Sequence, residues 1–318
     1  MHFSFAVLAA VLSVAHAQTR SDKRGLVFVP NKDHPEDNDI WVREGSDLTW
    51  YYNYGVTPSA AYASKSQNDF EFVPMLWGSI EDTSFLDSVT KQIEGGRNIT
   101  HVLSFNEPDG PSQFGGSNIF PWKAAQVWVN NILPLKEKGI KVGLPGCTGG
   151  PGGIPWLQQF LGNCSQLIST DGNQKNCSYD LYRFTGTGTS MASQVIWASI
   201  LLRMFPYPFP NKSQWITEYN YNDQDLKTTQ DFYKISAEYF DRLENVERYS
   251  YFGSFRSGVS NVGANAAMLN NDGKLTDIGS WYLGGQATGV DPQSGLAARS
   301  QVNVLLAVVL ALIGCLLI

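Results

Sequence analysis

The sequence predicts an α/β fold, a (β/α)₈ TIM barrel formed by a single domain over residues 25–289. Short apolar runs recur along this region, and helix-like or loop-like sequence separates them. The runs are continuously apolar, which is typical of parallel strands buried on both faces of a sheet. Eight such runs occur within about 265 residues, and both numbers match a (β/α)₈ barrel.

Strands and helices are predicted from these runs and from helical periodicity. Helices are expected over residues 83–94, 122–138, 189–204 and 228–244, with a kink at Pro134. Trp122, Trp128, Trp156 and Trp197 lie in helical stretches and are expected to pack in the core. The candidate strands are 25–30, 48–54, 71–77, 101–105, 140–146, 179–184, 213–219 and 248–255.

Both ends of the chain are predicted to be targeting segments. Residues 1–17 form an apolar run that ends at Ala15-His16-Ala17, as a cleaved signal peptide does. Residues 18–24 are a short N-terminal segment, in which Lys23-Arg24 is either a processing site or a solvated pair of charges. Residues 290–318 are a linker and an apolar tail, which predict a glycolipid (GPI) anchor signal, with a retained membrane helix as the alternative.

We therefore expect a secreted glycoprotein at the cell wall or the outer surface of the plasma membrane, attached to the membrane through that anchor alone. Cys164 and Cys177 enclose a short polar loop, and we predict that they form a disulfide in an oxidising compartment. Four Asn-x-Ser/Thr sequons are the candidate glycosylation sites: Asn98, Asn163, Asn176 and Asn211.

Composition excludes several classes of function. The net charge is −6 and basic residues form no cluster, which argues against a nucleic-acid partner. The cysteine spacing matches no zinc pattern, and the glycine-rich loops contain no phosphate-binding or dinucleotide fingerprint. We expect no metal, no cofactor and a monomer.

Two candidate strands carry a glutamate near their ends. Glu107 follows the fourth strand in HVLSFNEPDG, and Glu218 lies in the seventh, in SQWITEYNY. The carboxyl ends of barrel strands meet at one mouth, where catalytic residues lie. Two carboxylates about 5 Å apart suit retaining glycoside hydrolysis, because one attacks the sugar while the other protonates the leaving oxygen. A negative neighbour and burial would raise the pKa of the acid. The alternative is a pair of structural carboxylates.

Residues 25–289 resemble the glycosyl hydrolase catalytic-core family, glycoside hydrolase family 128, through WYYNYG, VPMLWG, LSFNEPDG, KVGLPGCTGG and WITEYNY. Its fungal members are secreted or wall-anchored β-1,3-glucanases and β-1,3-glucan-binding proteins. The resemblance implies that Glu107 is the acid/base, that Glu218 is the nucleophile and that β-1,3-glucan is the substrate. The segment YDLYRFTGTG departs from it, because the family usually has a His-Trp-Tyr-Gly-like segment there. The alternative function is therefore a β-glucan-binding barrel with little or no activity.

Aromatic and amide side chains near strand ends are the candidate sugar contacts, because aromatic faces stack on pyranose rings. Asn106 is placed to hydrogen-bond a sugar 2-hydroxyl. His101 is expected to be structural, at the opposite end of the barrel. Asp109 is expected to orient a loop, with substrate binding as the alternative. The predicted substrate-binding residues are Asn106, Asn53, Tyr52, Trp77, Tyr219 and Phe252.

Overall fold

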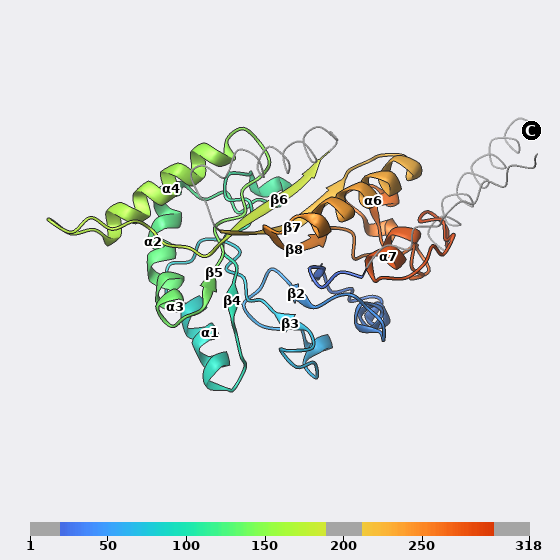
Figure 1. The fold of residues 1–318 in the computed structure, drawn as a ribbon, viewed down its shortest axis with the longest axis horizontal. Coiled ribbons are helices and arrows are strands. Elements are labelled where there is room, and N and C mark those ends of the chain that lie inside the picture. The colour runs from blue at the N-terminus through green and yellow to red at the C-terminus, as the bar shows by residue number, and fades with distance from the viewer. Residues whose placement is uncertain (1–19, 189–211, 296–318) are drawn as a thin grey trace, which may run out of the picture.

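The structure is a computed structural model that describes residues 20–188 and 212–295. Each of the eight predicted strands is present, although most are shorter than predicted (Figure 1). The strands are β1 (Gly25–Val27), β2 (Trp50–Tyr52), β3 (Glu71–Phe72), β4 (His101–Val102), β5 (Lys141–Val142), β6 (Leu181–Gly188), β7 (Ser213–Tyr221) and β8 (Val246–Tyr251).

All strand pairs are parallel and follow chain order. The pairs form three sheets, β1-β2-β3, β4-β5 and β6-β7-β8. Isolated parallel bridges connect these sheets: Met75 pairs with Leu103, Gly143 with Leu181, and Arg24 with Tyr249. Each sheet is thus bridged to the next, and β8 is bridged back to the start of β1. The α/β class and the parallel pairing are as predicted.

Two apolar clusters lie on opposite faces of this strand cycle. One contains Trp50, Val73, Leu103 and Trp215, and the rings of Trp50 and Trp215 are 5.1 Å apart. The larger cluster contains Tyr51, Phe72 and Val102, which are the neighbours in sequence of the first set, together with residues of the helices. Because successive strand residues point to opposite faces, one set packs among the strands and the other packs against the helices.

Helices α1 to α4 lie on one side of the strands in Figure 1, and α6 and α7 lie on the other. The predicted helix over residues 122–138 is broken at Ile132 into two helices, because Pro134 cannot continue the hydrogen-bond ladder. The α-helices described are α1 (Ser84–Glu94), α2 (Pro121–Asn131), α3 (Leu133–Glu137), α4 (Gly153–Ile168), α6 (Leu226–Arg242) and α7 (Asp277–Tyr282). None of the described helices is both long and apolar enough to cross a bilayer.

Some predictions of local structure were wrong or incomplete. Helix α4 contains Trp156, which was expected in a helical stretch, but its bounds were not predicted, since its GGPGG entry resembles a loop. The prediction that Trp122 packs in the core is wrong. Trp122 lies in the first turn of α2 and is 54 % exposed, whereas Trp128 and Trp156 are buried. The predicted signal peptide, the apolar tail, the helix over residues 189–204, Trp197 and Asn211 lie outside the described residues.

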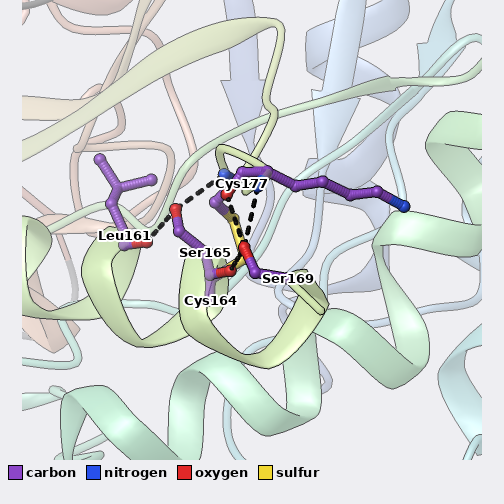
Figure 2. The surroundings of a disulfide bond; sticks show 6 residues. Leu161, Cys164, Ser165, Ser169 and Cys177 are labelled. Carbon is purple, nitrogen blue, oxygen red and sulfur yellow. Dashed lines mark hydrogen bonds between the residues drawn. A yellow bond between two sulfur atoms is a disulfide. The ribbon is translucent and has the colours of Figure 1, made fainter. Parts of the chain in front are cut away.

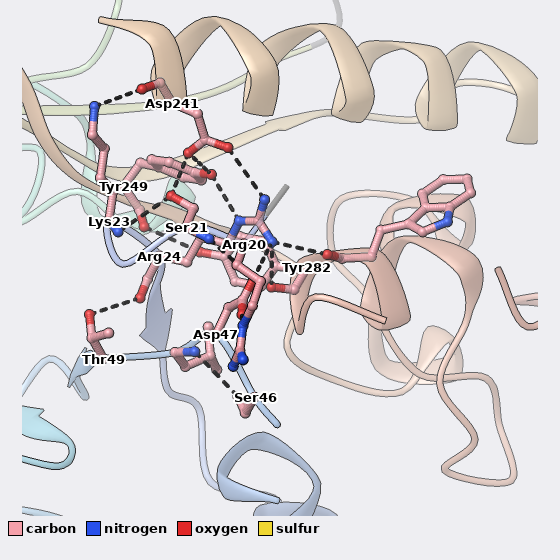
Figure 3. Close-up of polar contacts among 12 residues, drawn as sticks. Arg20, Ser21, Lys23, Arg24, Ser46, Asp47, Thr49, Asp241, Tyr249 and Tyr282 are labelled. Atoms are coloured by element: carbon pink, nitrogen blue, oxygen red, sulfur yellow. Dashed lines mark hydrogen bonds and ion pairs between the residues drawn. The ribbon is translucent and has the colours of Figure 1, made fainter. Parts of the chain in front are cut away.

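The segment before Gly25 is part of the fold (Figure 3). Arg24 is fully buried and donates hydrogen bonds to Asp47, Asp241 and the hydroxyl of Tyr249. The ammonium of Lys23 donates to three carbonyl groups at the end of α6, those of Phe240, Asp241 and Leu243. Lys23-Arg24 is therefore not a solvated pair on a free terminus, because both charges satisfy groups that the strands and α6 bring together.

The predicted disulfide joins Cys164 of α4 to Cys177, and Cys147 is a buried free cysteine. After the predicted domain end at residue 289, the chain stays packed as far as Ser294. Ser294 Oγ accepts a hydrogen bond from Asn270, and the Pro292 carbonyl accepts one from Ser257. The folded unit therefore extends beyond both predicted boundaries.

Candidate active site

Glu107 follows β4 and has an unusual backbone conformation. Its φ is +41°, in the left-handed region that a non-glycine residue adopts at a cost. The amide of Glu107 donates a 2.7 Å hydrogen bond to the Gly146 carbonyl, and its carbonyl accepts one from Gly110. These bonds hold the turn from β4 into its loop. The side chain of Glu107 is half-buried and so remains accessible from solvent.

Glu218 is 7 % exposed and lies within β7. The register between β6 and β7 shifts at this point: Phe184 pairs with Ile216, and Thr185 pairs with Glu218. Thr217 is the extra residue of the resulting bulge. Because the bulge interrupts strict alternation, Thr217 and Glu218 both face the strand interior, where their side chains contact Arg183 and Tyr52.

Two tyrosines of the second strand region contact the carboxylate of Glu218. The Tyr52 hydroxyl lies 3.3 Å from Glu218 Oε1 and 2.8 Å from the Thr217 carbonyl oxygen. Tyr54 also hydrogen-bonds Glu218, and its own φ is +60°. The rings of Tyr52 and Tyr54 meet edge to face with centroids 5.2 Å apart. This pair fixes the orientation of Glu218 and stabilises its ionised form.

Arg183 of β6 connects the strands that carry the two glutamates. Its guanidinium is buried and donates hydrogen bonds to the Ser104 carbonyl at 2.7 Å, to Asn106 Oδ1 at 3.1 Å and to Thr217 Oγ1 at 2.8 Å. Gly146 permits this approach, since a Cβ atom there would lie 3.1 Å from the guanidinium carbon. Arg183 thus fixes β4, β6 and β7 relative to one another.

The surroundings of the two carboxyl groups differ in charge. Burial, and then the negative charges of Glu218 and Asp109, raise the pKa of Glu107 to about 7. Burial also raises the pKa of Glu218, but Arg183, Tyr54 and Tyr52 oppose this effect. The arrangement therefore favours the proton on Glu107 rather than on Glu218. Such a pair can supply a proton and a nucleophile to one substrate.

Several predicted substrate residues lie near this pair. The Trp77 carbonyl accepts a hydrogen bond from the amide of Asn106, and the Trp77 side chain is 39 % exposed. Asn106 itself is held by Arg183 and by the Gly115 carbonyl, which leaves one amide hydrogen for a ligand. Phe252 is half-buried beside the interior cluster and lies 5.4 Å from the ring of Phe255.

The structure does not place two predicted residues toward the carboxylates. Tyr219 was expected to contact substrate, and this is wrong: it is 2 % exposed and packs against Phe240 and Tyr251 on the helix-facing side. The reason is that Tyr219 and Glu218, as neighbours in a strand, point to opposite faces. The amide of Asn53 hydrogen-bonds Gly55 and Thr57 within its own loop, so it shapes that loop.

Sequence reasoning missed Tyr54, Arg183 and Thr185. Thr185 hydrogen-bonds Glu107 and the carbonyls of Gly146 and Cys147. A charged residue between Tyr182 and Phe184, in the middle of a predicted buried strand, is a signal that could have identified Arg183, because buried arginines need partners. Tyr54 carried no such signal, since WYYNY contains three tyrosines of similar context.

The predictions that Asp109 orients a loop and that His101 is structural agree with the structure. Asp109 accepts hydrogen bonds from the amide and hydroxyl of Thr148, so it orients the loop after β5. His101, at the first position of β4, hydrogen-bonds Glu71, which also pairs with Arg248. This polar group lies at the amino ends of β3 and β4, opposite the glutamates. Across the described ranges, no group of three or more His, Cys, Asp or Glu residues is placed to hold a metal ion.

The family profile described as "Glycosyl hydrolase catalytic core" matches residues 25–282. The chain belongs to this family. The match covers all eight strands as well as both glutamates, and it confirms the resemblance inferred from the sequence motifs.

A curated relative of this glycosyl hydrolase family member is "Alkali-sensitive linkage protein 1" of Schizosaccharomyces pombe. The two are 28 % identical over 273 residues, which cover 83 % of this chain. The aligned region spans 44 % of the length of that relative.

Solved structures with the same fold include enzymes and a binding protein of glycoside hydrolase family 128. The endo-β-1,3-glucanase of Pseudomonas viridiflava superposes with a TM-score of 0.65 at 22 % identity, covering 85 % of this chain and 100 % of that chain. The curdlan-specific exo-β-1,3-glucanase of Blastomyces gilchristii, in complex with glucose, gives 0.61 at 24 % identity, covering 83 % and 99 %. An oligosaccharide-binding protein of Trichoderma gamsii gives 0.59 at 19 % identity, covering 84 % and 94 %.

Proposed function

We propose that this chain is a retaining glycoside hydrolase that cleaves β-1,3-glucan in a (β/α)₈ barrel. The observation that carries the proposal is the electrostatic difference between two glutamates in the segments of β4 and β7. Glu218 accepts hydrogen bonds from Tyr52 and Tyr54 and faces Arg183, while Glu107 faces the negative charges of Glu218 and Asp109. Similarity to β-1,3-glucanases supports the choice of substrate.

The first step uses both carboxyl groups. The Glu218 carboxylate attacks the anomeric carbon and forms a glycosyl ester, while Glu107 gives its proton to the departing glycosidic oxygen. The half-buried position of Glu107 suits this role, because an acid exchanges protons with solvent between turnovers. Glu218 needs no such access and is almost fully buried.

The second step reverses the role of Glu107. The resulting Glu107 carboxylate takes a proton from water, and the water oxygen attacks the anomeric carbon and releases Glu218. Two displacements at one carbon retain its configuration. The pKa of Glu107 near 7 suits a group that must act as acid and then as base.

We further propose that the protein is exported and held at the cell wall or the outer membrane surface by a glycolipid anchor, as a glycosylated monomer without a cofactor. The chain features that support export are the apolar N-terminal run, the apolar C-terminal tail and the sequons. A disulfide joins the cysteines of two of these sequons, which suits an oxidising compartment.

Proton NMR of the first sugar released from a linear β-1,3-glucan tests the mechanism. A retaining enzyme releases the β-anomer first, and the α-anomer appears later by mutarotation. Initial release of the α-anomer would overturn the double displacement. Binding of the glucan with no release of sugar would show instead a β-glucan-binding barrel, in line with the oligosaccharide-binding protein of Trichoderma gamsii.

A further inference from the structure

Two sequons of this chain share an arrangement around the disulfide. In Asn163-Cys164-Ser165 and in Asn176-Cys177-Ser178, the middle residue is a cysteine. These two cysteines are bonded to each other, with a sequence separation of 13 (Figure 2). One covalent bond therefore constrains both glycosylation motifs, although their local structures differ.

Asn163 lies inside a helix. Helix α4 runs to Ile168, five residues beyond Asn163. Successive helical residues are rotated by about 100°, so Asn163 and Ser165 point in directions about 200° apart. In an extended chain, by contrast, residues i and i+2 lie on the same side. A transferase that must contact the asparagine amide and the hydroxyl two residues later finds them together only when this part of α4 is open.

The Ser165 hydroxyl is also occupied. It donates a 2.8 Å hydrogen bond to the Leu161 carbonyl and accepts one of 2.9 Å from the amide of Cys177. The second bond joins the helix to the segment that carries the other cysteine, as Figure 2 shows. Cys164 is fully buried beneath these contacts. Opening the first motif therefore requires loss of the hydrogen bonds, and the disulfide keeps their partners close.

Asn176 is in the opposite situation. Residues 174–179 form neither helix nor strand, and the side chains of Asn176 and Ser178 are exposed. The backbone amides on either side of Asn176 are anchored, because Lys175 donates to Ser169 Oγ and Cys177 donates to Ser165 Oγ. Asn176 thus lies on an irregular surface segment, where a transferase can still contact the motif after folding.

We propose that Asn176 carries an N-linked glycan and that closure of the Cys164–Cys177 disulfide withholds Asn163 from the same modification. This inference rests on the proposed export, because both reactions need the secretory pathway. It goes further than export, because formation of the disulfide would determine which of the two asparagines on this face carries a glycan.

Glycosylation of Asn176 and formation of the disulfide each need a co-reactant. In glycosyl transfer, the Asn176 amide nitrogen bonds to the anomeric carbon of a lipid-diphosphate oligosaccharide. The carbon–oxygen bond to the diphosphate breaks, the diphosphate keeps the electron pair, and the amide loses one proton. In disulfide formation, the two thiols lose two protons and two electrons to a disulfide oxidant, which becomes a dithiol.

The test is glycopeptide mass spectrometry of the full chain expressed in a secreting eukaryotic cell, on total as well as secreted protein, so that folding is not required for detection. The wild type should carry a glycan at Asn176 and little at Asn163. In Cys177→Ser both sequons persist but the disulfide is lost, and occupancy of Asn163 should rise about tenfold as local opening becomes easier. Cys147→Ser is the matched control, because that cysteine is free and the disulfide remains.

Each alternative result has a separate meaning. A glycan at Asn163 in wild-type protein that also contains the intact disulfide would overturn the inference, as would equal occupancy of Asn163 in Cys177→Ser and the wild type. A glycan at the exposed Asn98 but none at Asn176 would overturn it while leaving export intact. No glycan at any sequon and no secretion would refute the proposed export, and the inference would fail with it.

Discussion

The guanidinium of Arg183 on β6 donates a 3.1 Å hydrogen bond to the amide oxygen of Asn106, the residue that precedes Glu107. The same guanidinium bonds Thr217, the residue that precedes Glu218. One buried guanidinium thus binds the side chains of the residues that precede the two glutamates in the sequence. The sixth strand therefore links the two segments that carry the glutamates.

We predict that Arg183→Met lowers kcat/KM by about 100-fold, because small displacements of catalytic groups are costly. The pH profile should also change. Arg183 lowers the pKa of Glu107 and of Glu218, so its removal should move both limbs of the kcat/KM profile to higher pH.

Arg248→Lys is the control for Arg183→Met. Arg248 is a partly buried arginine whose guanidinium lies over the ring of Trp215, and it pairs with Glu71 at the opposite end of the strands. Arg248→Lys should lower the free energy of unfolding without shifting either limb of the kcat/KM profile against pH. Unshifted limbs in Arg183→Met would show that Arg183 has a structural role only.

Activity should decline on the alkaline side with a midpoint near pH 7. The reason is that Glu107 must be protonated to act as the acid, and its pKa is raised to about 7. Asp109 contributes to that shift through its negative charge, so Asp109→Asn should move the alkaline midpoint below 7. The measurement is kcat/KM against pH for both proteins. An alkaline midpoint near the ordinary glutamate value would contradict the raised pKa of Glu107.

The raised pKa of Glu107 also predicts a pH-dependent stability. A folded-state pKa above the unfolded one means that the folded state binds the proton more tightly, so this contribution is present below about pH 4.5 and is lost as the pH rises through about 7. Glu107→Gln cannot ionise. It should be more stable than the wild type at pH 8, by up to about 3 kcal/mol, and nearly equal at pH 4.

Urea unfolding at the two pH values measures this difference for Glu107→Gln. Glu81→Gln is the matched control, because the Glu81 side chain is 84 % exposed. A Glu107→Gln variant that is no more stable than the wild type at pH 8 would contradict the account of the buried carboxyl group.

The buried Arg24 should contribute strongly to stability. Arg24→Met leaves Asp47 and Asp241 without their buried cation, and we expect a loss of about 3–5 kcal/mol. Arg20 pairs with the same Asp47 but its side chain is 74 % exposed, so Arg20→Met should cost at most about 1 kcal/mol. Thermal and urea unfolding compare the two variants. Equal losses would show that burial of Arg24 adds nothing.

The strand order and both glutamates could be predicted from the sequence, since apolar runs such as HVLSF end at residues with clear chemistry. Which side chains of β7 point inward could not be predicted. Strict alternation from the inward Trp215 would place Tyr219 inward and Glu218 outward, and the bulge at Thr217 reverses this. A bulge has no sequence signature here. The contacts of Arg183 also join residues 79 positions apart, which no local pattern reveals.

The most direct test of the proposed hydrolysis compares wild type with Glu218→Gln in two assays, reducing-end release from linear β-1,3-glucan and glucan pull-down. We expect release by the wild type, none by the variant, and pull-down of both, because glutamine keeps the shape of the side chain but cannot attack the anomeric carbon. Undiminished release by Glu218→Gln would contradict the proposed nucleophile. Pull-down of the wild type with no release at all would contradict the proposed hydrolysis.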